Sequence, residues 1–447
     1  MKRYEEYKAT GTEWMPSIPV WWDIQKIGAL FAQRKEKVSD KDFAPISVTK
    51  SGILPQLATA VKTDDGDNRK KVCVGDFVIN SRSDRKGSCG VSSLKGSVSL
   101  INIVLEPREQ LSGKYTHYLL RSHLFSEEFY RNGRGIVADL WTTRYSEMKT
   151  ILLPVPPREE QDQIVRYLDW QVSKINRLIA AKRKQIALLH EQHKRRISEA
   201  VLHGNDDGCC QKDSGVEWIG MIPEHWSVIR CKYVFTERDE RSIAGEEEHL
   251  SMSQKYGLVP DSKLDERRML SESYVGGKVC YKNDLVLNRL KAHLGVFALS
   301  PQKGVISPDY TVLIPNAERI LPTYGEAVLK SDLCRRELRI RVRGIIEGFW
   351  RLYTDDFNTI VIPLPTLKEQ RQIMEYIGAL YKKFTVLKQN LEKEIIVLQD
   401  LRTRLISDVV TGQVDVREIE VPEFEYVDEG DATDEQNKVE TEDEEDG

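Results

Sequence analysis

The sequence lacks the long apolar runs and the regular cysteine spacing of membrane proteins and zinc-binding domains. Its 447 residues include no run of about 18 consecutive apolar side chains, the length that a membrane-spanning helix needs. Residues 1–6 contain no apolar stretch of the kind found in secretory signals. The seven cysteines are odd in number and form no pair of CxxC motifs, which is typical of a reducing compartment and disfavours structural zinc. We therefore expect a cytoplasmic protein that binds no metal.

Motifs for catalysis and nucleotide binding are missing as well. The chain has no GxxxxGK[ST] phosphate loop and no GxGxxG after a strand. The Asn-Pro-Pro-aromatic or Asp-Pro-Pro-Tyr tetrapeptide of amino-methyltransferases is absent, since the nearest segment, residues 307–310, lacks the first amide or carboxylate, and no nuclease-like Asp/Glu-x-Lys follows Asp309 nearby. His190 and His193 lie one helical turn apart without a third ligand, so we expect packed or solvated histidines. We predict no catalytic, cofactor-binding or metal-binding residue; a methyltransferase or nuclease in its own right is the alternative that an S-adenosylmethionine binding assay would test.

Charge is unevenly distributed along the chain. From Glu418 to Gly447, fifteen acidic residues accompany one lysine, a net charge of −14; because the whole chain carries −4 at pH 7, residues 1–417 carry +10. A basic body is expected of a protein that meets a polyanion. The tail, which we place at residues 413–447, has the acidic and weakly apolar composition of disordered segments. It either keeps the protein soluble or screens the basic surface against nonspecific nucleic acid, and charge patterning alone does not decide between the two.

The chain contains a long internal repeat. Residues 11–19 (GTEWMPSIP) return as 215–223 (GVEWIGMIP), Trp22 as Trp226, 75–80 (GDFVIN) as 283–288 (NDLVLN), Trp141 as Trp350, and 154–156 (PVP) as 363–365 (PLP). A repeat of this length predicts two copies of one module with internal pseudo-twofold symmetry. Whatever such a molecule binds should itself have two parts.

Within each copy, short β-branched runs alternate with a helical segment. Residues 72–80 and 98–105 predict strands and 115–130 a helix in the first copy; residues 279–288, 305–314 and 322–340 predict the same elements in the second. We therefore predict two α+β (mixed α/β) domains, over residues 1–157 and 205–366.

A long helix follows each module, and we place these helices at residues 158–204 and 367–412. Pro157 marks the start of the first, Thr366–Glu369 forms a capping box for the second, and Gly204 and Gly412 suit left-handed C-caps. At about 1.5 Å per residue, each helix is roughly 65–70 Å long. Heptad positions in the first helix are Val165, Leu168, Val172, Ile175, Ile179, Lys182, Ile186, Leu189, His193 and Ile197. Those in the second are Ile373, Ile377, Leu380, Phe384, Leu387, Leu391, Ile395, Leu398, Arg402, Leu405 and Val409.

The sustained heptad pattern predicts that the two helices form an antiparallel coiled coil. The first helix leaves the first module and must reach the second, and the second helix runs back, so that pairing places the modules at opposite ends of a shared rod. Such a rod would fix the separation between the modules. The alternative is that each helix packs onto its own module.

These motifs resemble those of one protein family. Residues 212–226 (KDSGVEWIGMIPEHW) look like the opening of target-recognition domains in specificity subunits of type I restriction–modification systems. Residues 154–161 and 363–370 resemble the family's passage into its conserved spacer helices. The resemblance covers residues 10–412, in both halves and in the family's order. The first half departs from the pattern at Pro16-Ser17 and Val20-Trp21, where the second has Gly-Met and Glu-His.

The resemblance implies a DNA-reading adaptor that catalyses no reaction itself. Each target-recognition domain would read one half of a bipartite DNA site, and the helices would set the unspecified gap and dock two methyltransferase subunits. S-adenosylmethionine would come with those subunits, and ATP and Mg with restriction–translocase subunits, so that this chain itself binds no cofactor. A scaffold whose two modules bind proteins is the alternative, and the salt dependence of duplex binding would discriminate between them.

Basic and polar residues in matched loops are the candidate DNA contacts, because arginine suits guanine edges or phosphate and lysine suits phosphate. Any one of them could equally be a solvated surface charge. We expect Trp14, Trp22, Trp141 and their counterparts to anchor the cores rather than to stack on bases. The candidates are Lys50, Ser51, Arg82, Ser83, Arg85, Lys86, Arg134 and Arg144 in the first module, and Lys255, Tyr256, Asn288, Arg289, Lys291, His293, Arg343 and Arg351 in the second.

Overall fold

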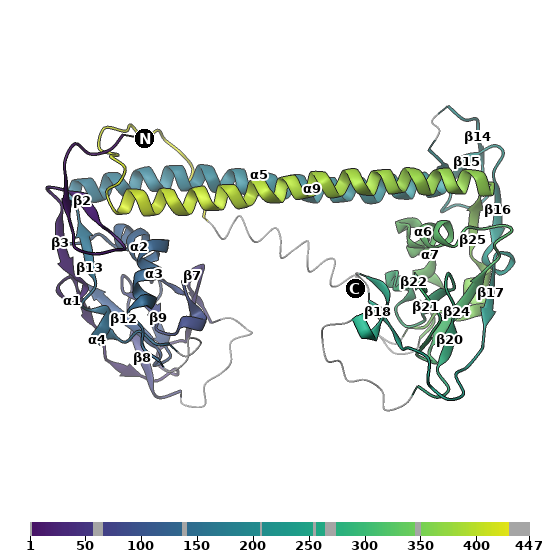
Figure 1. Ribbon diagram of the computed structural model, residues 1–447, viewed down its shortest axis with the longest axis horizontal. Helices are drawn as coiled ribbons and strands as arrows, with labels where there is room; N and C mark the ends of the chain where they lie inside the picture. The colour runs from purple at the N-terminus through teal and green to yellow at the C-terminus, as the bar shows by residue number, and fades with distance from the viewer. Residues whose placement is uncertain are drawn as a thin grey trace. The chain divides into compact units, whose positions relative to one another are not determined.

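The computed structural model describes residues 2–56, 66–135, 141–205, 208–253, 256–263, 274–344 and 350–428. The chain divides into two compact units: unit 1 comprises residues 1–183 and 392–435, and unit 2 comprises residues 184–391 and 436–447. Each unit holds one α+β module and a part of each of two long helices, α5 (Arg158–His203) and α9 (Leu367–Val410), which are labelled in Figure 1. The predicted mixed fold with two repeated modules is confirmed.

Unit 1 contains the first module, whose main sheet is antiparallel with strand order β10-β9-β12-β4. Its strands are β1 (Tyr7–Ala9), β2 (Ser17–Pro19), β3 (Asp23–Lys26), β4 (Phe31–Gln33), β5 (Lys37–Val38), β6 (Ile46–Thr49), β7 (Gly52–Pro55), β8 (Arg69–Val72), β9 (Phe77–Asn80), β10 (Cys89–Val91), β11 (Gly96–Val98), β12 (Asn102–Pro107) and β13 (Leu152–Val155). Its shorter helices are α1 (Ile27–Leu30), η1 (Ser83–Arg85), α2 (Gly113–Arg121), α3 (His123–Arg131) and α4 (Tyr145–Met148).

Unit 2 repeats this arrangement, with a main antiparallel sheet of order β17-β24-β21-β22. Its strands are β14 (Gln211–Asp213), β15 (Met221–Pro223), β16 (Ser227–Arg230), β17 (Phe235–Arg238), β18 (Leu250–Ser253), β19 (Gly257–Pro260), β20 (Lys278–Cys280), β21 (Leu285–Asn288), β22 (Phe297–Leu299), β23 (Gly304–Ile306), β24 (Tyr310–Pro315) and β25 (Val361–Leu364). Its shorter helices are η3 (Cys231–Tyr233), η4 (Asp261–Lys263), η5 (Ala292–Leu294), α6 (Pro322–Lys330), α7 (Asp332–Arg341) and α8 (Thr354–Thr359). The sheet order matches that of unit 1 strand by strand, as the internal repeat predicts.

Each strand predicted over residues 72–80 and 98–105 is divided in two by a turn. Between β8 and β9, Gly75 adopts a left-handed φ of +90°, and the Asp76 carboxylate accepts a hydrogen bond of 2.8 Å from the Cys73 backbone N–H. Arg34, the residue that follows β4, donates hydrogen bonds of 2.7 and 3.0 Å to the Asp76 carboxylate. The ion pair stabilises a turn that the continuous β-branched run does not reveal.

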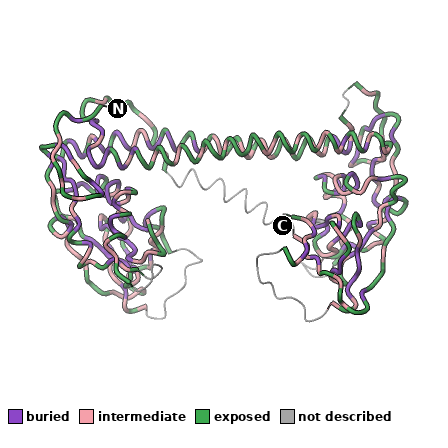
Figure 2. The backbone as a smooth tube through the Cα atoms, viewed as in Figure 1, coloured by how far each residue is buried: buried purple, intermediate pink, exposed green. Residues whose placement is uncertain are grey.

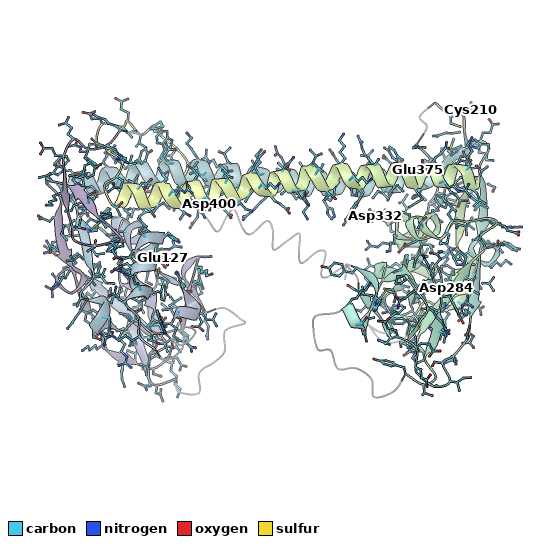
Figure 3. The ribbon with its side chains drawn as sticks, in the orientation of Figure 1. Glu127, Cys210, Asp284, Asp332, Glu375 and Asp400 are labelled. Carbon is cyan, nitrogen blue, oxygen red and sulfur yellow. The ribbon has the colours of Figure 1, made fainter. Side chains whose placement is uncertain are left out.

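The same correction applies to the predicted strands 279–288 and 305–314 of unit 2. Asn283 takes the left-handed position of Gly75, with φ of +71°, because asparagine tolerates this conformation better than other side chains. Asp284, labelled in Figure 3, accepts from the Tyr281 N–H at 2.8 Å and from Arg238 at 2.9 and 3.3 Å. The repeat is thus conserved between the modules down to a partly buried ion pair.

The helices predicted over residues 115–130 and 322–340 are each two shorter helices. Ser122 ends α2 in an extended conformation, and its hydroxyl caps α3 by accepting from the Phe125 N–H at 3.3 Å. Ser331 does the same between α6 and α7, accepting from the Cys334 N–H at 3.4 Å. Serine is a favoured N-cap residue, and the apolar spacing continues across the break, so the periodicity alone conceals it.

Aromatic side chains occupy the centre of each module. Trp22 in unit 1 and Trp226 in unit 2 are buried, as predicted, and so is Trp14. Figure 2 shows the buried residues concentrated in the modules and at the helix ends, whereas the middle of each long helix is half-buried or exposed.

A buried glutamine joins each module to the start of its long helix. In unit 1, Gln161 accepts from the Ser112 N–H and donates to the carbonyls of Gln110 and Pro156, each at 2.9 Å. In unit 2, Gln370 accepts from the Leu321 N–H at 2.7 Å and donates to two further carbonyls at 2.9 Å. The glutamine of the Glu-Gln motif therefore fixes the direction in which the helix leaves the module.

The capping box predicted for α9 is confirmed. The Glu369 N–H donates to the Thr366 hydroxyl at 3.3 Å, and the Thr366 N–H donates to the Glu369 carboxylate at 3.1 Å. Glu369 also accepts from the indole of Trp226 at 3.2 Å and hydrogen-bonds His225. Glu160 plays the corresponding part in unit 1, where it accepts from Tyr4 and Trp21 at 2.6 and 3.1 Å.

The two long helices pair antiparallel within each unit. In unit 1, Lys182 of α5 forms an ion pair of 2.7 Å with Glu394 of α9, and Arg402 donates to Asn176 at 2.7 Å. In unit 2, His193 of α5 stacks on Phe384 of α9 with ring centroids 4.5 Å apart. The polar residues in the predicted heptads thus have partners on the facing helix, and the predicted antiparallel coiled coil is confirmed.

The heptad prediction is wrong at Leu387, whose side chain is 40% exposed. Most other heptad residues in the middle of the helices are half-buried. Two helices alone cannot enclose a seam, so full burial begins only where a module packs against the pair, as at Val165, Leu168, Leu405 and Val409 in unit 1.

Each module also holds the end of the helix that arrives from the other. In unit 1, Tyr115 of α2 donates to the carbonyl of Val410 at 3.1 Å; in unit 2, Tyr324 of α6 donates to the carbonyl of Val201 at 2.9 Å. Beyond these contacts, Gly412 and Gly204 are left-handed, with φ of +72° and +83°, as a C-cap requires. In unit 1 the start of α5 and the end of α9 therefore share one module.

The prediction of a disordered tail from residue 413 is wrong for its first part. Val414 and Val416 are buried in the core of unit 1, and Gln163 of α5 donates to the carbonyls of Val416 and Ile419 at 2.9 and 2.7 Å. Further on, the backbone of Val427 bonds to α5. Packing against a helix that is distant in sequence outweighs the acidic composition. The rest of the predicted tail, residues 429–447, lies outside the described residues.

Candidate nucleic-acid interface

In unit 1, three segments that are far apart in the sequence meet at the end of β9. Ser83 N–H donates to the carbonyl of Trp141 at 3.0 Å, and Thr143 N–H donates to the carbonyl of Ser81 at 2.9 Å. On its other side, Thr142 exchanges backbone hydrogen bonds of 3.1 and 3.2 Å with Arg134. Arg82 and Arg134 therefore flank Thr142, and Arg144 lies two residues further along. We call residues 81–83, 134 and 141–144 the unit 1 ladder.

Unit 2 builds the same ladder from the matching residues. Arg343 and Arg351 exchange backbone hydrogen bonds of 2.9 and 2.8 Å, and Leu352 N–H donates to the carbonyl of Arg289 at 2.9 Å. We call residues 289, 343 and 351–352 the unit 2 ladder. In both units the fold brings together the loop after the central strand and the segment before the last short helix, as the matched positions of the candidates suggest.

The arginines of the two ladders differ in their partners. Arg82 pairs with Asp84 at 3.1 Å, Arg343 pairs with Asp356, and Arg289 donates to the carbonyl of Asp309 at 2.6 Å. Arg134, Arg144 and Arg351 are exposed, and none of them forms an ion pair with any residue that the structure describes. These three guanidinium groups are the ladder charges best placed to meet phosphate or a base edge.

The remaining candidates of the first module lie in two neighbouring loops. Lys50 and Ser51 form the exposed turn between β6 and β7. Arg85 is exposed after the ladder, and Lys86 pairs with Glu127 at 2.5 Å. The turn and the ladder are separate features of the module.

In the second module, Tyr256 is 70% exposed in the turn between β18 and β19, which matches the turn of Lys50. Asn288 uses its side-chain carbonyl to accept from the Leu290 N–H at 3.1 Å, and Lys291 is exposed. Lys255 lies outside the described residues, as does the side chain of His293.

A pocket of about 470 Å³ beside the unit 1 ladder contains a basic residue that sequence reasoning missed. Lys70 of β8 lines it together with Arg82 and Arg144, and its ammonium group donates to the carbonyls of Leu100 and Asn102 at 2.8 and 2.5 Å. Burial lowers the pKa of Lys70. The run Arg69-Lys70-Lys71, three cations within a short strand, was the signal that could have identified it.

The prediction that Trp141 anchors the core is wrong. Its side chain is 39% exposed, in the unit 1 ladder between the arginine positions, and its counterpart Trp350 is half-buried. The ladder fixes the backbone of Trp141 through the hydrogen bond from Ser83 and leaves the indole at the surface.

The described residues include neither a metal-binding cluster nor a helix that could span a membrane. They contain no group of three or more His, Cys, Asp or Glu side chains arranged to hold a metal ion. Among them, too, no helix combines the length and apolar character needed to cross a bilayer.

Comparisons with known proteins agree on one family. A family model described as the type I restriction modification DNA specificity domain matches residues 240–396. The specificity subunit of the type I restriction enzyme MjaVIII of Methanocaldococcus jannaschii is 23% identical over 426 residues, which cover 90% of this chain and 95% of that protein. The EcoKI specificity subunit of Escherichia coli is 21% identical over 367 residues, covering 77% and 76%.

A solved structure supports the fold. One chain from a study of complex assembly and conformational transition of the type I restriction–modification system is 16% identical, with a TM-score of 0.53 over 89% of this chain and 99% of that chain. The matched family model, the relatives that span both modules, the doubled motifs and the paired helices lead to one conclusion. The chain is similar, over both modules, to the specificity subunits of type I restriction–modification systems.

Proposed function

We propose that each module of this subunit reads one half of a bipartite DNA site. The observation that carries the proposal is the occurrence of the same ladder in both units, each with an exposed arginine that forms no ion pair with a described residue: Arg134 and Arg144 in unit 1 and Arg351 in unit 2. Guanidinium groups of this kind bind phosphate oxygens or the O6 and N7 atoms of guanine. The net charge of +10 over residues 1–417 favours DNA over a protein partner.

The two long helices would set the gap between the half-sites. They contain 46 and 44 residues and are continuous. Buried glutamines hold their starts, and Tyr115 and Tyr324 hold their ends, against the modules. A helix rises about 1.5 Å per residue, so each is roughly 66–69 Å long. A change in the number of residues should therefore change the spacing that the protein selects.

The helices would also dock two methyltransferase subunits, and restriction–translocase subunits would complete the assembly in the cytoplasm. S-adenosylmethionine, ATP and Mg would bind to those partners, and this chain would contribute specificity alone. The apolar residues Leu188 of α5 and Val386 of α9 support such docking, since their side chains are 50% and 56% exposed.

A matched pair of substitutions tests the division of labour. Arg134→Ala should relax or abolish recognition of one half-site, and Arg351→Ala should affect the other, because the two residues belong to different modules. Mapping of methylated adenines in DNA from cells that carry the variant with its partner subunits would read out both half-sites. Lys26→Ala, an exposed lysine of β3 outside the ladder, is the control. If either arginine variant altered both half-sites, the modular reading of DNA would be wrong.

A further inference from the structure

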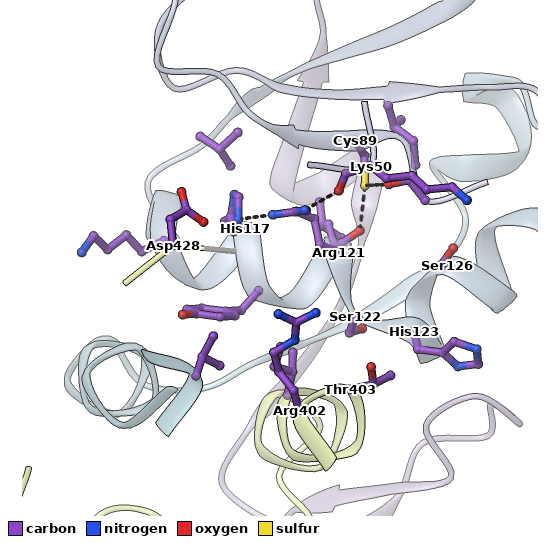
Figure 4. Close-up of a pocket in the computed structure, with 18 of the residues that line it drawn as sticks. Lys50, Cys89, His117, Arg121, Ser122, His123, Ser126, Arg402, Thr403 and Asp428 are labelled. Carbon is purple, nitrogen blue, oxygen red and sulfur yellow. Dashed lines mark hydrogen bonds between the residues drawn. The ribbon is translucent and has the colours of Figure 1, made fainter. Parts of the chain in front are cut away.

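A pocket of about 870 Å³ lies in unit 1, between the helices α2 and α3, the facing helices α5 and α9, and the C-terminal segment (Figure 4). The charged residues that line it are Lys50, Lys86, Lys114, Arg121, Arg402, Glu127, Asp169 and Asp428, five cations against three carboxylates. The lining is therefore positively charged, and a ligand of opposite charge would be favoured there.

Arg121 and Lys50 form no ion pair with a carboxylate among the described residues. The Arg121 guanidinium binds the Nε2 atom of His117 at 2.7 Å and the carbonyl of Lys50 at 2.6 Å, both uncharged acceptors, as Figure 4 shows. Burial and the charge of Arg121 lower the pKa of His117 to about 4, so the imidazole is neutral at pH 7. Lys86 and Lys114, by contrast, are matched by Glu127 and Asp169. The unmatched positive charge is that of Arg121 and Lys50.

The C-terminal segment leads directly to this charge. The Val427 N–H donates to the hydroxyl of Ser173 at 3.1 Å, and its carbonyl accepts from Asn176 at 3.0 Å, so both backbone groups are held by α5. The next residue, Asp428, lines the pocket and lies near enough to His117 for its charge to raise the pKa of that imidazole, against the larger lowering effects. Residues 429–435 follow in the sequence and include four acidic side chains.

We propose that this pocket is a binding site for an acidic peptide and that its ligand is residues 429–435 of the same chain. The acidic residues are Glu429, Asp431, Asp434 and Glu435. They are tethered next to the pocket by Val427, so their effective concentration there is high. Their carboxylates supply the charge that Arg121 and Lys50 lack.

The proposal has a consequence that rests on the proposed DNA-reading function. Lys50, one of the two cations that the segment would neutralise, lines the pocket and is also a candidate DNA contact. A bound acidic segment would therefore compete with duplex DNA for Lys50 and would weaken nonspecific binding. Specific sites would be affected less, because base contacts add to the phosphate contacts there.

The first experiment tests the pocket without DNA. Full-length protein is treated with a carbodiimide, which joins a carboxylate and an amine that are in contact, and the products are mapped by mass spectrometry. We expect the Lys50 amine to be joined to carboxylates of residues 429–435, and Arg121→Ala to reduce this product several-fold. Lys50→Arg keeps the charge and should remove the product. A Lys50 product with residues 440–446 at equal yield, or no product with residues 429–435, would overturn the proposal.

The second experiment tests competition with matched variants. The proximal variant carries E429Q, D431N, D434N and E435Q; the distal control carries E440Q, E442Q, D443N and E444Q and loses the same charge. Binding of a duplex of arbitrary sequence is measured by fluorescence anisotropy between 50 and 200 mM salt. Freeing Lys50 should steepen the dependence of log K on log salt by about 0.9, roughly a three- to fourfold difference across this range.

The distal variant should change the slope much less. Equal slopes for the two variants would overturn the competition. If no variant bound duplex DNA, the proposed DNA-reading function would fail. The cross-linking result would still test whether residues 429–435 bind in the pocket.

Discussion

Replacement of Gly412 by alanine should destabilise unit 1 far more than the matching replacement of Gly204 destabilises unit 2. Both glycines end a long helix in the left-handed conformation, with φ of +72° and +83°. An added Cβ at Gly412 would lie 2.5 Å from Cδ of Pro19 and 3.1 Å from the ring of Trp22. At Gly204 the nearest atom is a ring carbon of Trp226 at 3.3 Å. The two substitutions thus share the backbone strain and differ in the clash.

The magnitudes follow from these distances. The left-handed backbone costs an alanine roughly 1–2 kcal/mol at either position. At Gly412 the rigid ring of Pro19 cannot turn aside, so overpacking adds about 1–3 kcal/mol, for a total of roughly 2–5 kcal/mol. At Gly204 a shift of a few tenths of an ångström relieves the contact, and we expect about 1–2 kcal/mol in all.

Hydrogen exchange of the two helix ends measures the effect separately in each unit. Gly412→Ala should accelerate exchange in the last turn of α9, and Gly204→Ala should accelerate it less in the last turn of α5. The melting temperature of each variant, followed by circular dichroism, gives the total loss. Equal losses for the two variants, or a neutral Gly412→Ala, would refute the account of how α9 is held against the first module.

Two further predictions concern the junctions between module and helix. Gln161→Ala removes three hydrogen bonds and leaves the buried N–H of Ser112 and the buried carbonyl of Pro156 unsatisfied, so it should lower the free energy of unfolding by about 3 kcal/mol. Gln370→Ala should have a similar effect in unit 2. An unchanged urea midpoint would contradict this. Burial alone would raise the pKa of Glu369, but hydrogen bonds from His225, Thr366 and Trp226 outweigh it and lower the pKa to about 2. Its contribution to stability is therefore present above about pH 4.5 and lost as the pH falls towards 2, and Glu369→Gln should flatten the acid limb of a pH–stability curve.

Features with a local cause could be predicted from the sequence. The helix bounds follow from Thr366, Gly204 and Gly412, whose conformational preferences are properties of the residues themselves. The pairing of the helices could be predicted because a sustained apolar heptad pattern is typical of helices that pair in a coiled coil. The repeat predicted the matched sheets, because the same residues fold in the same way twice.

Features that depend on tertiary contacts could not be predicted from the sequence. The breaks at Ser122 and Ser331 leave the apolar period intact, and the turns before β9 and β21 depend on Asp76 and Asp284 meeting an arginine from a distant strand. The order of residues 413–428 depends on donors such as Gln163 of α5.

The candidate site shows the same limit. The matched loops were identified by their position in the repeat, but the exposure of Trp141 and the participation of Lys70 follow from how three loops meet at a strand end. The partner of each arginine is likewise a matter of geometry: Arg82 and Asp84 are near neighbours in sequence, whereas Arg343 and Asp356 are not.

The central claim is that two DNA-reading modules are spaced by the paired helices, and one measurement tests it most directly. Seven residues are inserted after Leu189 in α5 and seven at the facing turn of α9 beside Phe384, which keeps the heptad stripe in register. The helices lengthen by about 10 Å, roughly three base pairs of duplex. Mapping of methylated adenines in cells that express the variant with its partner subunits should show both half-sites unchanged and the gap between them longer by a few base pairs. A variant that assembles and methylates with its gap unchanged would contradict the account.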